Sequence, residues 1–177
     1  MKKFLLGILM YLIFIVCYVL QANFFDWFTI AGISPNIFII LILFLGLFTN
    51  NKFSIILSLL IGATLDLVST KTFGVTAVMF CLIAVLAGYF DKNFSKENRV
   101  SILILVVGMT IFYELITYLL NAMILELPLE MFSFIRILAI EVLYNAILTF
   151  IFYNLILRLG GVLERQFRQR NILTRYF

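Results

Sequence analysis

The sequence contains no histidine and two cysteines, Cys17 and Cys81, which lie in separate apolar runs. Because histidine and cysteine are the usual ligands of zinc and haem iron, their scarcity argues against a soft-metal or haem site. We interpret both cysteines as small packing residues, not as a disulfide or a metal pair. The chain also lacks a Ser/His/Asp or Cys/His arrangement and a glycine-rich phosphate loop. We therefore predict a protein that is not an enzyme, with no cofactor and no nucleic-acid partner.

The sequence also contains few charged residues. Charged residues make up 12% of the 177 residues and hydrophobic residues 64%, with a mean hydropathy of +1.17. A soluble domain is about half apolar and about a quarter charged. Since about 20 apolar residues span a bilayer, the chain has room for about six spans and no soluble domain. We predict an all-α integral membrane protein with a single transmembrane domain over residues 1–177.

Six apolar runs predict a bundle of six transmembrane helices. The second run is the weakest, because its apolar core after Pro35 is short for a full crossing. A tilted helix, a locally thinned bilayer and a partial entry into the membrane all stay open for it. The first run lacks a small-residue cleavage site, so we expect a retained helix and not a signal peptide. The predicted spans are 4–22, 35–49, 52–70, 73–90, 100–121 and 133–157.

The basic residues indicate how the bundle is oriented. Nearly all of them fall on one predicted side, the exceptions being Lys71 and Arg136. The positive-inside rule then places both termini in the cytoplasm, which an even number of spans permits. The basic tail, 158–177, is expected to bind anionic lipid headgroups, with docking of a cytoplasmic partner as the alternative. Gly160 and Gly161 are expected to end the sixth helix.

Small residues recur at helical spacing in the third and fourth runs, which we interpret as a tight transmembrane hairpin over residues 53–90. In lipid, small side chains let helix backbones approach each other closely. We therefore expect these residues to serve helix packing or the binding of a partner's helix. The candidates are Gly62, Gly74, Ala77, Cys81, Ala84 and Gly88.

Four ionisable residues lie inside the predicted spans: Asp66, Glu114, Arg136 and Glu141. Charged groups are costly there, and their overlapping depths permit one buried polar cluster. Asp66 and Arg136 lie at similar depth, so we expect an ion pair between them. Glu114 and Glu141 would then face polar neighbours or be protonated. Three roles stay open for the cluster: interhelical hydrogen bonding, a polar cavity for a small ligand or ion, and contact with a partner's transmembrane helix.

Three segments carry a resemblance to a known family: Pro35 and Asn36 opening a Leu/Ile-rich span, residues 59–67 (LLIGATLDL), and residues 74–77 (GVTA). Together they resemble the MreD family of rod shape-determining membrane proteins, and the likeness covers nearly the whole chain. The resemblance implies a multi-pass protein of the bacterial cytoplasmic (inner) membrane, within the elongation machinery (elongasome). It also implies association with MreC, a single-span protein, and through it with the MreB filament and the wall-building glycosyltransferase and transpeptidase.

Two functions of different classes follow from this resemblance. The first is a non-enzymatic scaffold for cell shape, which binds an MreC-like protein and helps to organise peptidoglycan synthesis. The second arises because the family resembles, more distantly, the substrate-binding subunits of energy-coupling-factor vitamin transporters. Such a subunit would capture a vitamin-sized molecule in a polar, outward-facing cavity. Against it, the first span lacks the small-residue face that these subunits use for docking, since Gly7 and Tyr11 are a poor substitute.

Overall fold

The computed structural model describes residues 2–69, 72–91 and 98–173. Within these ranges the regular structure is helical, apart from an isolated β-bridge between Ile30 and Ile33. This confirms the all-α fold predicted from composition. The elements in chain order are α1 (Lys2–Asn23), η1 (Phe25–Phe28), α2 (Ile37–Phe48), α3 (Asn51–Ser69), α4 (Val75–Phe90), α5 (Arg99–Leu125) and α6 (Met131–Leu173).

The helices fall into two length classes. Four of them, α1, α3, α5 and α6, are long and apolar enough to cross a membrane. The other two are shorter, with 12 residues in α2 and 16 in α4. At about 1.5 Å per residue these two helices are about 18 Å and about 24 Å long, less than the roughly 30 Å hydrocarbon core. Length thus supports four candidate spans among the described residues, and the count of six crossings stays a prediction.

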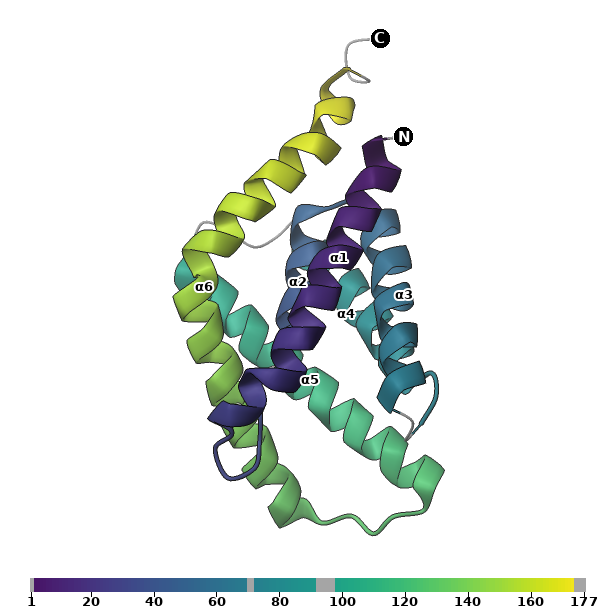
Figure 1. Ribbon diagram of the computed structural model, residues 1–177, viewed down its shortest axis with the longest axis vertical. Helices are drawn as coiled ribbons and strands as arrows, with labels where there is room; N and C mark the ends of the chain where they lie inside the picture. Colours follow the sequence, from purple (N-terminus) through teal and green to yellow (C-terminus); the bar gives the residue numbers. More distant parts are fainter. Residues whose placement is uncertain (1, 70–71, 92–97, 174–177) are drawn as a thin grey trace.

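The start of α1 and the end of α6 lie at the same end of the bundle (Figure 1). The α1–α2 connection and the α5–α6 connection lie at the opposite end, which we call the connection end. Because α3 runs between them, α2 and α4 point the same way, and each begins toward the connection end. The two short helices therefore place their N-termini in the same half of the bundle.

The core is built around α2. All of its residues except Ile37 and Leu41 are buried, as expected for a helix that is apolar on every side. It contacts all five other α-helices. By contrast, α1 is loosely attached: few of its side chains are buried, Met10 and Phe14 among them, and its exposed large residues are apolar. Such a surface suits the acyl chains of a bilayer.

Glycines of α3 and α2 let both helices come close to α4. A Cβ added to Gly62 of α3 would overlap Ala77 Cα and lie 2.8 Å from the Ala77 nitrogen. A Cβ added to Gly46 of α2 would overlap the Ala87 side chain and lie 3.0 Å from the Ala84 carbonyl oxygen. Backbone therefore meets backbone at both contacts, which is the packing that small residues allow in membranes.

The expected end of the last helix at Gly160 and Gly161 is wrong, because α6 continues to Leu173. Gly160 lies against the aromatic ring of Phe48, where an added Cβ would come within 2.6 Å of the ring. A glycine inside a helix costs about 1 kcal/mol relative to alanine. Here the missing side chain makes room for Phe48 at the end of α2, so this glycine serves packing and not helix termination.

Candidate functional site

Asp66 holds the start of α4 from the neighbouring helix. This residue of α3 is 5% exposed. Its Oδ2 accepts hydrogen bonds from the backbone N–H groups of Gly74 and Ala77, both at 3.0 Å, and its Oδ1 accepts one from Thr76 at 3.2 Å. The first N–H groups of a helix have no partner within that helix. Since Gly74, the N-cap residue, has no side chain to offer, Asp66 supplies the cap.

The first turn of α2 is held in the same way by two other helices. Asn145 of α6 is fully buried; its Oδ1 accepts a hydrogen bond from the Asn36 N–H at 3.0 Å, and its Nδ2 donates to Thr110 of α5 at 3.1 Å. Gln21 of α1 accepts a hydrogen bond from the Ile37 N–H at 3.3 Å. Both short helices thus begin inside the bundle with their N–H groups satisfied by side chains from elsewhere.

Glu114 of α5 and Glu141 of α6 meet between their helices. Their side chains lie close together, and Glu141 also lies beside the Asn36 side chain. Thr117 and Tyr118 lie one turn from Glu114 on the same face of α5. We call these five residues, Asn36, Glu114, Thr117, Tyr118 and Glu141, the glutamate cluster. Among the described residues, no group of three or more His, Cys, Asp or Glu side chains could hold a metal ion.

The structure corrects one expected contact of the four ionisable residues. It brings Glu114 and Glu141 together, but no ion pair joins Asp66 to Arg136 within the described ranges. The carboxylate of Asp66 accepts hydrogen bonds from the α4 backbone, and Arg136 is exposed on α6. The expected ion pair was inferred from depth along each helix. Depth does not tell which helices are neighbours, and in the described residues the backbone of α3, which carries Asp66, does not pack against that of α6, which carries Arg136.

The small residues of α4 point mostly toward neighbouring helices. Ala77 and Ala84 lie at the two close contacts described above. Gly88 lies against the Asn51 side chain at the start of α3, and Cys81 is half-buried. The small residues of α4 are therefore used largely within the bundle, which leaves less of this face for a partner's helix than the sequence suggested.

Gly74 has a different role from the other glycines of the hairpin. Nothing lies within 4 Å of an added Cβ, and its φ of +94° is a left-handed conformation that residues with a side chain avoid. We expect Gly74→Ala to lower the free energy of unfolding by about 1 kcal/mol through backbone strain. Thermal unfolding in nanodiscs measures this loss. An unchanged melting temperature would contradict the assignment of strain to this turn.

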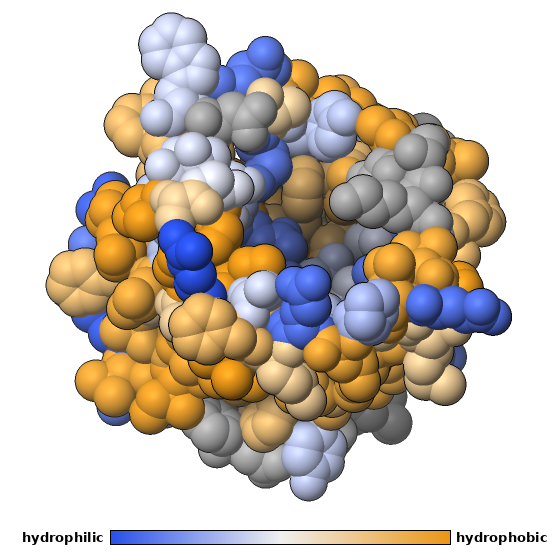
Figure 2. Space-filling view, turned by 90° about the horizontal axis from the view of Figure 1, so that it is seen from below, coloured by the Kyte–Doolittle hydropathy of each residue, from blue (hydrophilic) through white to orange (hydrophobic). Residues whose placement is uncertain are grey.

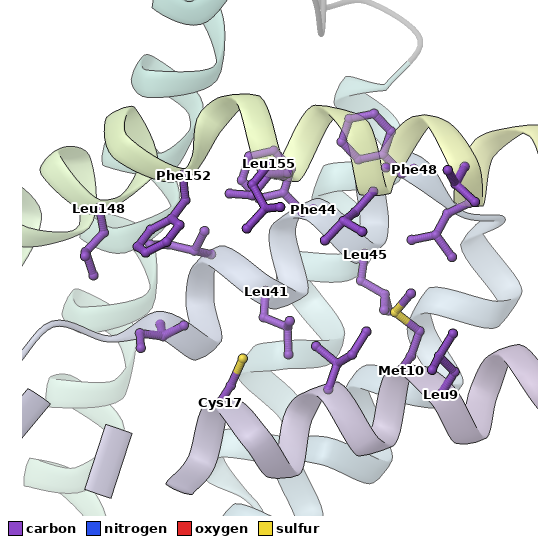
Figure 3. A pocket seen from close by; sticks show the side chains of 18 of the residues that line it. Leu9, Met10, Cys17, Leu41, Phe44, Leu45, Phe48, Leu148, Phe152 and Leu155 are labelled. Carbon is purple, nitrogen blue, oxygen red and sulfur yellow. The ribbon is translucent and has the colours of Figure 1, made fainter. Parts of the chain in front are cut away.

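An apolar groove runs between α1 and α6, with α2 as its floor (Figure 3). It encloses about 440 Å³. Side chains from all three helices point into it, and the labelled ones are Leu9, Met10, Cys17, Leu41, Phe44, Leu45, Phe48, Leu148, Phe152 and Leu155. Leu9 and Leu155 line the groove yet are 51% and 52% exposed, so the groove opens outward. We call it the α1/α6 groove. Sequence reasoning missed it, because apolar residues give no signal against an apolar background.

Comparison with models of known protein families gives a match over most of the chain. Residues 2–159 match the model of a family described as rod shape-determining protein MreD. The match covers α1 to α5 and the first part of α6. No curated protein and no solved structure matches, so the likeness to vitamin-transporter subunits stays a prediction. With most of its length matched, and with long apolar helices fit to cross a membrane, the chain belongs to the MreD family of rod shape-determining proteins.

Proposed function

We propose that the protein is a non-enzymatic membrane scaffold of the bacterial elongation machinery. In this role it binds the transmembrane helix of an MreC-like single-span protein in the α1/α6 groove. Family membership supports the part in rod shape. Through that partner the scaffold would connect to the MreB filament and to the glycosyltransferase and transpeptidase that build peptidoglycan. The α1/α6 groove is the observation that carries the proposal.

The shape and chemistry of the groove suit a helix in lipid. Within a bilayer, helices associate through packing and not through the hydrophobic effect, so a fitting surface is needed. The groove has a floor, α2, and two walls, α1 and α6. Its lining includes the aromatic rings of Phe44 and Phe152, and the flexible Met10, which can adjust to an incoming side chain. The loose attachment of α1 would let that wall move as a helix enters.

We further propose a location in the cytoplasmic membrane, with six crossings and both ends of the chain in the cytoplasm. The shared end of α1 and α6 supports an even number of crossings (Figure 1). The helices α3 and α5 begin in the half of the bundle nearer that end, and their first turns carry Lys52 and Arg99, which supports its cytoplasmic orientation. The short helices α2 and α4 would complete the count as partial-length segments with capped N-termini. Arg158 and Arg165, exposed on α6, would contact anionic lipid headgroups.

The Leu155→Trp variant tests the groove directly. The larger side chain occupies space inside the groove, so we expect recovery of a co-expressed MreC-like partner to fall about tenfold, a loss of about 1.4 kcal/mol in binding. Co-purification from membranes, quantified by mass spectrometry, gives the measurement. Leu155 is half exposed, so the chain itself should keep its thermal stability.

Ile104→Trp provides the matched control. Ile104 lies on α5, is 61% exposed and does not line the groove. This variant should recover the partner as the unsubstituted protein does. If both tryptophan variants bind the partner fully, or both lose it to the same extent, the groove is not where the partner binds.

A further inference from the structure

The glutamate cluster takes no part in the proposed scaffold role. None of its five residues lines the α1/α6 groove, so a partner's helix in that groove would not touch them. The cluster nevertheless places two carboxyl groups between membrane-embedded helices, where ionisable groups are costly and are normally paired. No ion pair neutralises Glu114 or Glu141 among the described residues. Either protonation or a bound ligand would relieve the cost of burying this pair.

The polar atoms of the cluster show what is missing. Glu141 is 6% exposed, and its Oε1 has no hydrogen-bond partner. Asn36 Oδ1, Thr117 Oγ1 and the Tyr118 hydroxyl are also buried and without a partner. Buried polar groups are nearly always hydrogen-bonded. Each of these four oxygens can accept a hydrogen bond or coordinate a cation. The two hydroxyls can also donate, but the Asn36 amide oxygen and an ionised Glu141 oxygen cannot, so these two acceptors need a donor or a positive charge.

The connection end of the bundle gives access to this region. Figure 2 looks along the bundle from that end and shows a hollow with hydrophilic residues inside it. The short helices explain the hollow: α2 and α4 begin inside the bundle and leave space between the longer helices toward this end. Asn36 directly precedes α2, so the glutamate cluster lies at the level where α2 begins. A small hydrophilic solute could reach the cluster from this side.

We propose that the glutamate cluster binds one small monovalent cation that enters from the connection end. A cation beside the unpartnered Glu141 Oε1 would favour the ionised form of that carboxyl group, as a nearby opposite charge does. Carboxylate, amide and hydroxyl oxygens are the ligands of hard cations, and they equally accept the hydrogen bonds of a primary ammonium group. The ligand is thus an alkali metal ion or a primary amine. This proposal does not depend on the partner helix.

Thermal unfolding of the full chain in nanodiscs tests the proposal. The probes are sodium chloride and methylammonium chloride, compared with choline chloride at equal ionic strength, because choline has no N–H donor. We expect at least one probe to raise the melting temperature by about 2–4 °C over choline. A rise with sodium identifies a metal ion, and a rise with methylammonium identifies an amine site. No rise with either probe overturns the proposal.

Two glutamine variants of the same protein locate the site. Glu141→Gln removes the carboxylate while keeping the size of the side chain, so the rise over choline should disappear. Glu130→Gln is the matched control, because Glu130 is exposed in the α5–α6 connection, outside the cluster. It should keep the full rise. Since each variant is compared with itself in choline, a change in basal stability does not affect the result. An equal rise in Glu141→Gln, or its loss in Glu130→Gln, overturns the proposal.

Discussion

The Gly62→Leu variant is expected to lose about 4 kcal/mol of folding stability or to fail to fold, at the upper end of single-substitution effects. A Cβ at this position would overlap Ala77 Cα and lie 3.0 Å from the Thr76 carbonyl oxygen. These are backbone atoms of α4, which cannot turn aside as a flexible side chain can. Overpacking alone costs about 1–3 kcal/mol, and here α3 and α4 must also separate. Thermal unfolding in nanodiscs measures the loss.

Gly108→Leu is the control for this experiment. Gly108 lies inside α5, and a Cβ added there meets nothing within 4 Å. Leucine favours helix over glycine, so this variant should be unchanged or more stable by up to about 1 kcal/mol. Equal losses in the two variants would show that leucine at any helical glycine is harmful, and the close approach of α3 and α4 would then explain nothing.

Asp66→Leu should be about as damaging, with a loss of about 4 kcal/mol. The substitution leaves the N–H groups of Gly74, Thr76 and Ala77 without an acceptor, and each unsatisfied buried donor costs about 1–3 kcal/mol. Asp66→Asn keeps one acceptor oxygen, so its loss should be smaller, about 1–2 kcal/mol. The melting temperature should therefore be highest for the unsubstituted protein, lower for Asp66→Asn and lowest for Asp66→Leu.

The same series separates hydrogen bonding from charge. If Asp66→Asn unfolds as readily as Asp66→Leu, the negative charge beside the α4 N-terminus matters more than the number of acceptors. Hydrogen exchange of the backbone amides of Gly74, Thr76 and Ala77 provides a second measurement. Their protection should be partly kept in the asparagine variant and lost in the leucine variant.

Several features of the fold and site could be predicted because lipid narrows the choices. With no water to satisfy backbone groups, apolar runs must form helices, so composition was enough for the all-α class. The spacing of Gly62, Asp66 and Gly74 pointed to the α3–α4 hairpin, which the structure forms. Glu114 and Glu141 were expected at similar depth, and they meet.

The remaining features depend on rotation and packing, which spacing does not reveal. Arg136 and Asp66 matched in depth but point to different surroundings. A glycine near the end of an apolar run looks the same in the sequence whether it ends a helix or makes room for an aromatic ring, as Gly160 does for Phe48. Gln21 and Asn145 cap the N-terminus of α2. In the sequence, each of them is an amide residue inside an apolar run, and that was the signal available for its role. Which N–H groups those amides meet follows from the tertiary arrangement alone.

Photocrosslinking in native membranes tests the scaffold role most directly. A photoreactive phenylalanine analogue would replace Leu9 or Leu155, which line the α1/α6 groove, or Ile104, which does not. We expect the two groove positions to crosslink to the transmembrane segment of an MreC-like partner, and Ile104 to crosslink to lipid alone. Partner crosslinks from Ile104 with none from the groove positions would contradict the account.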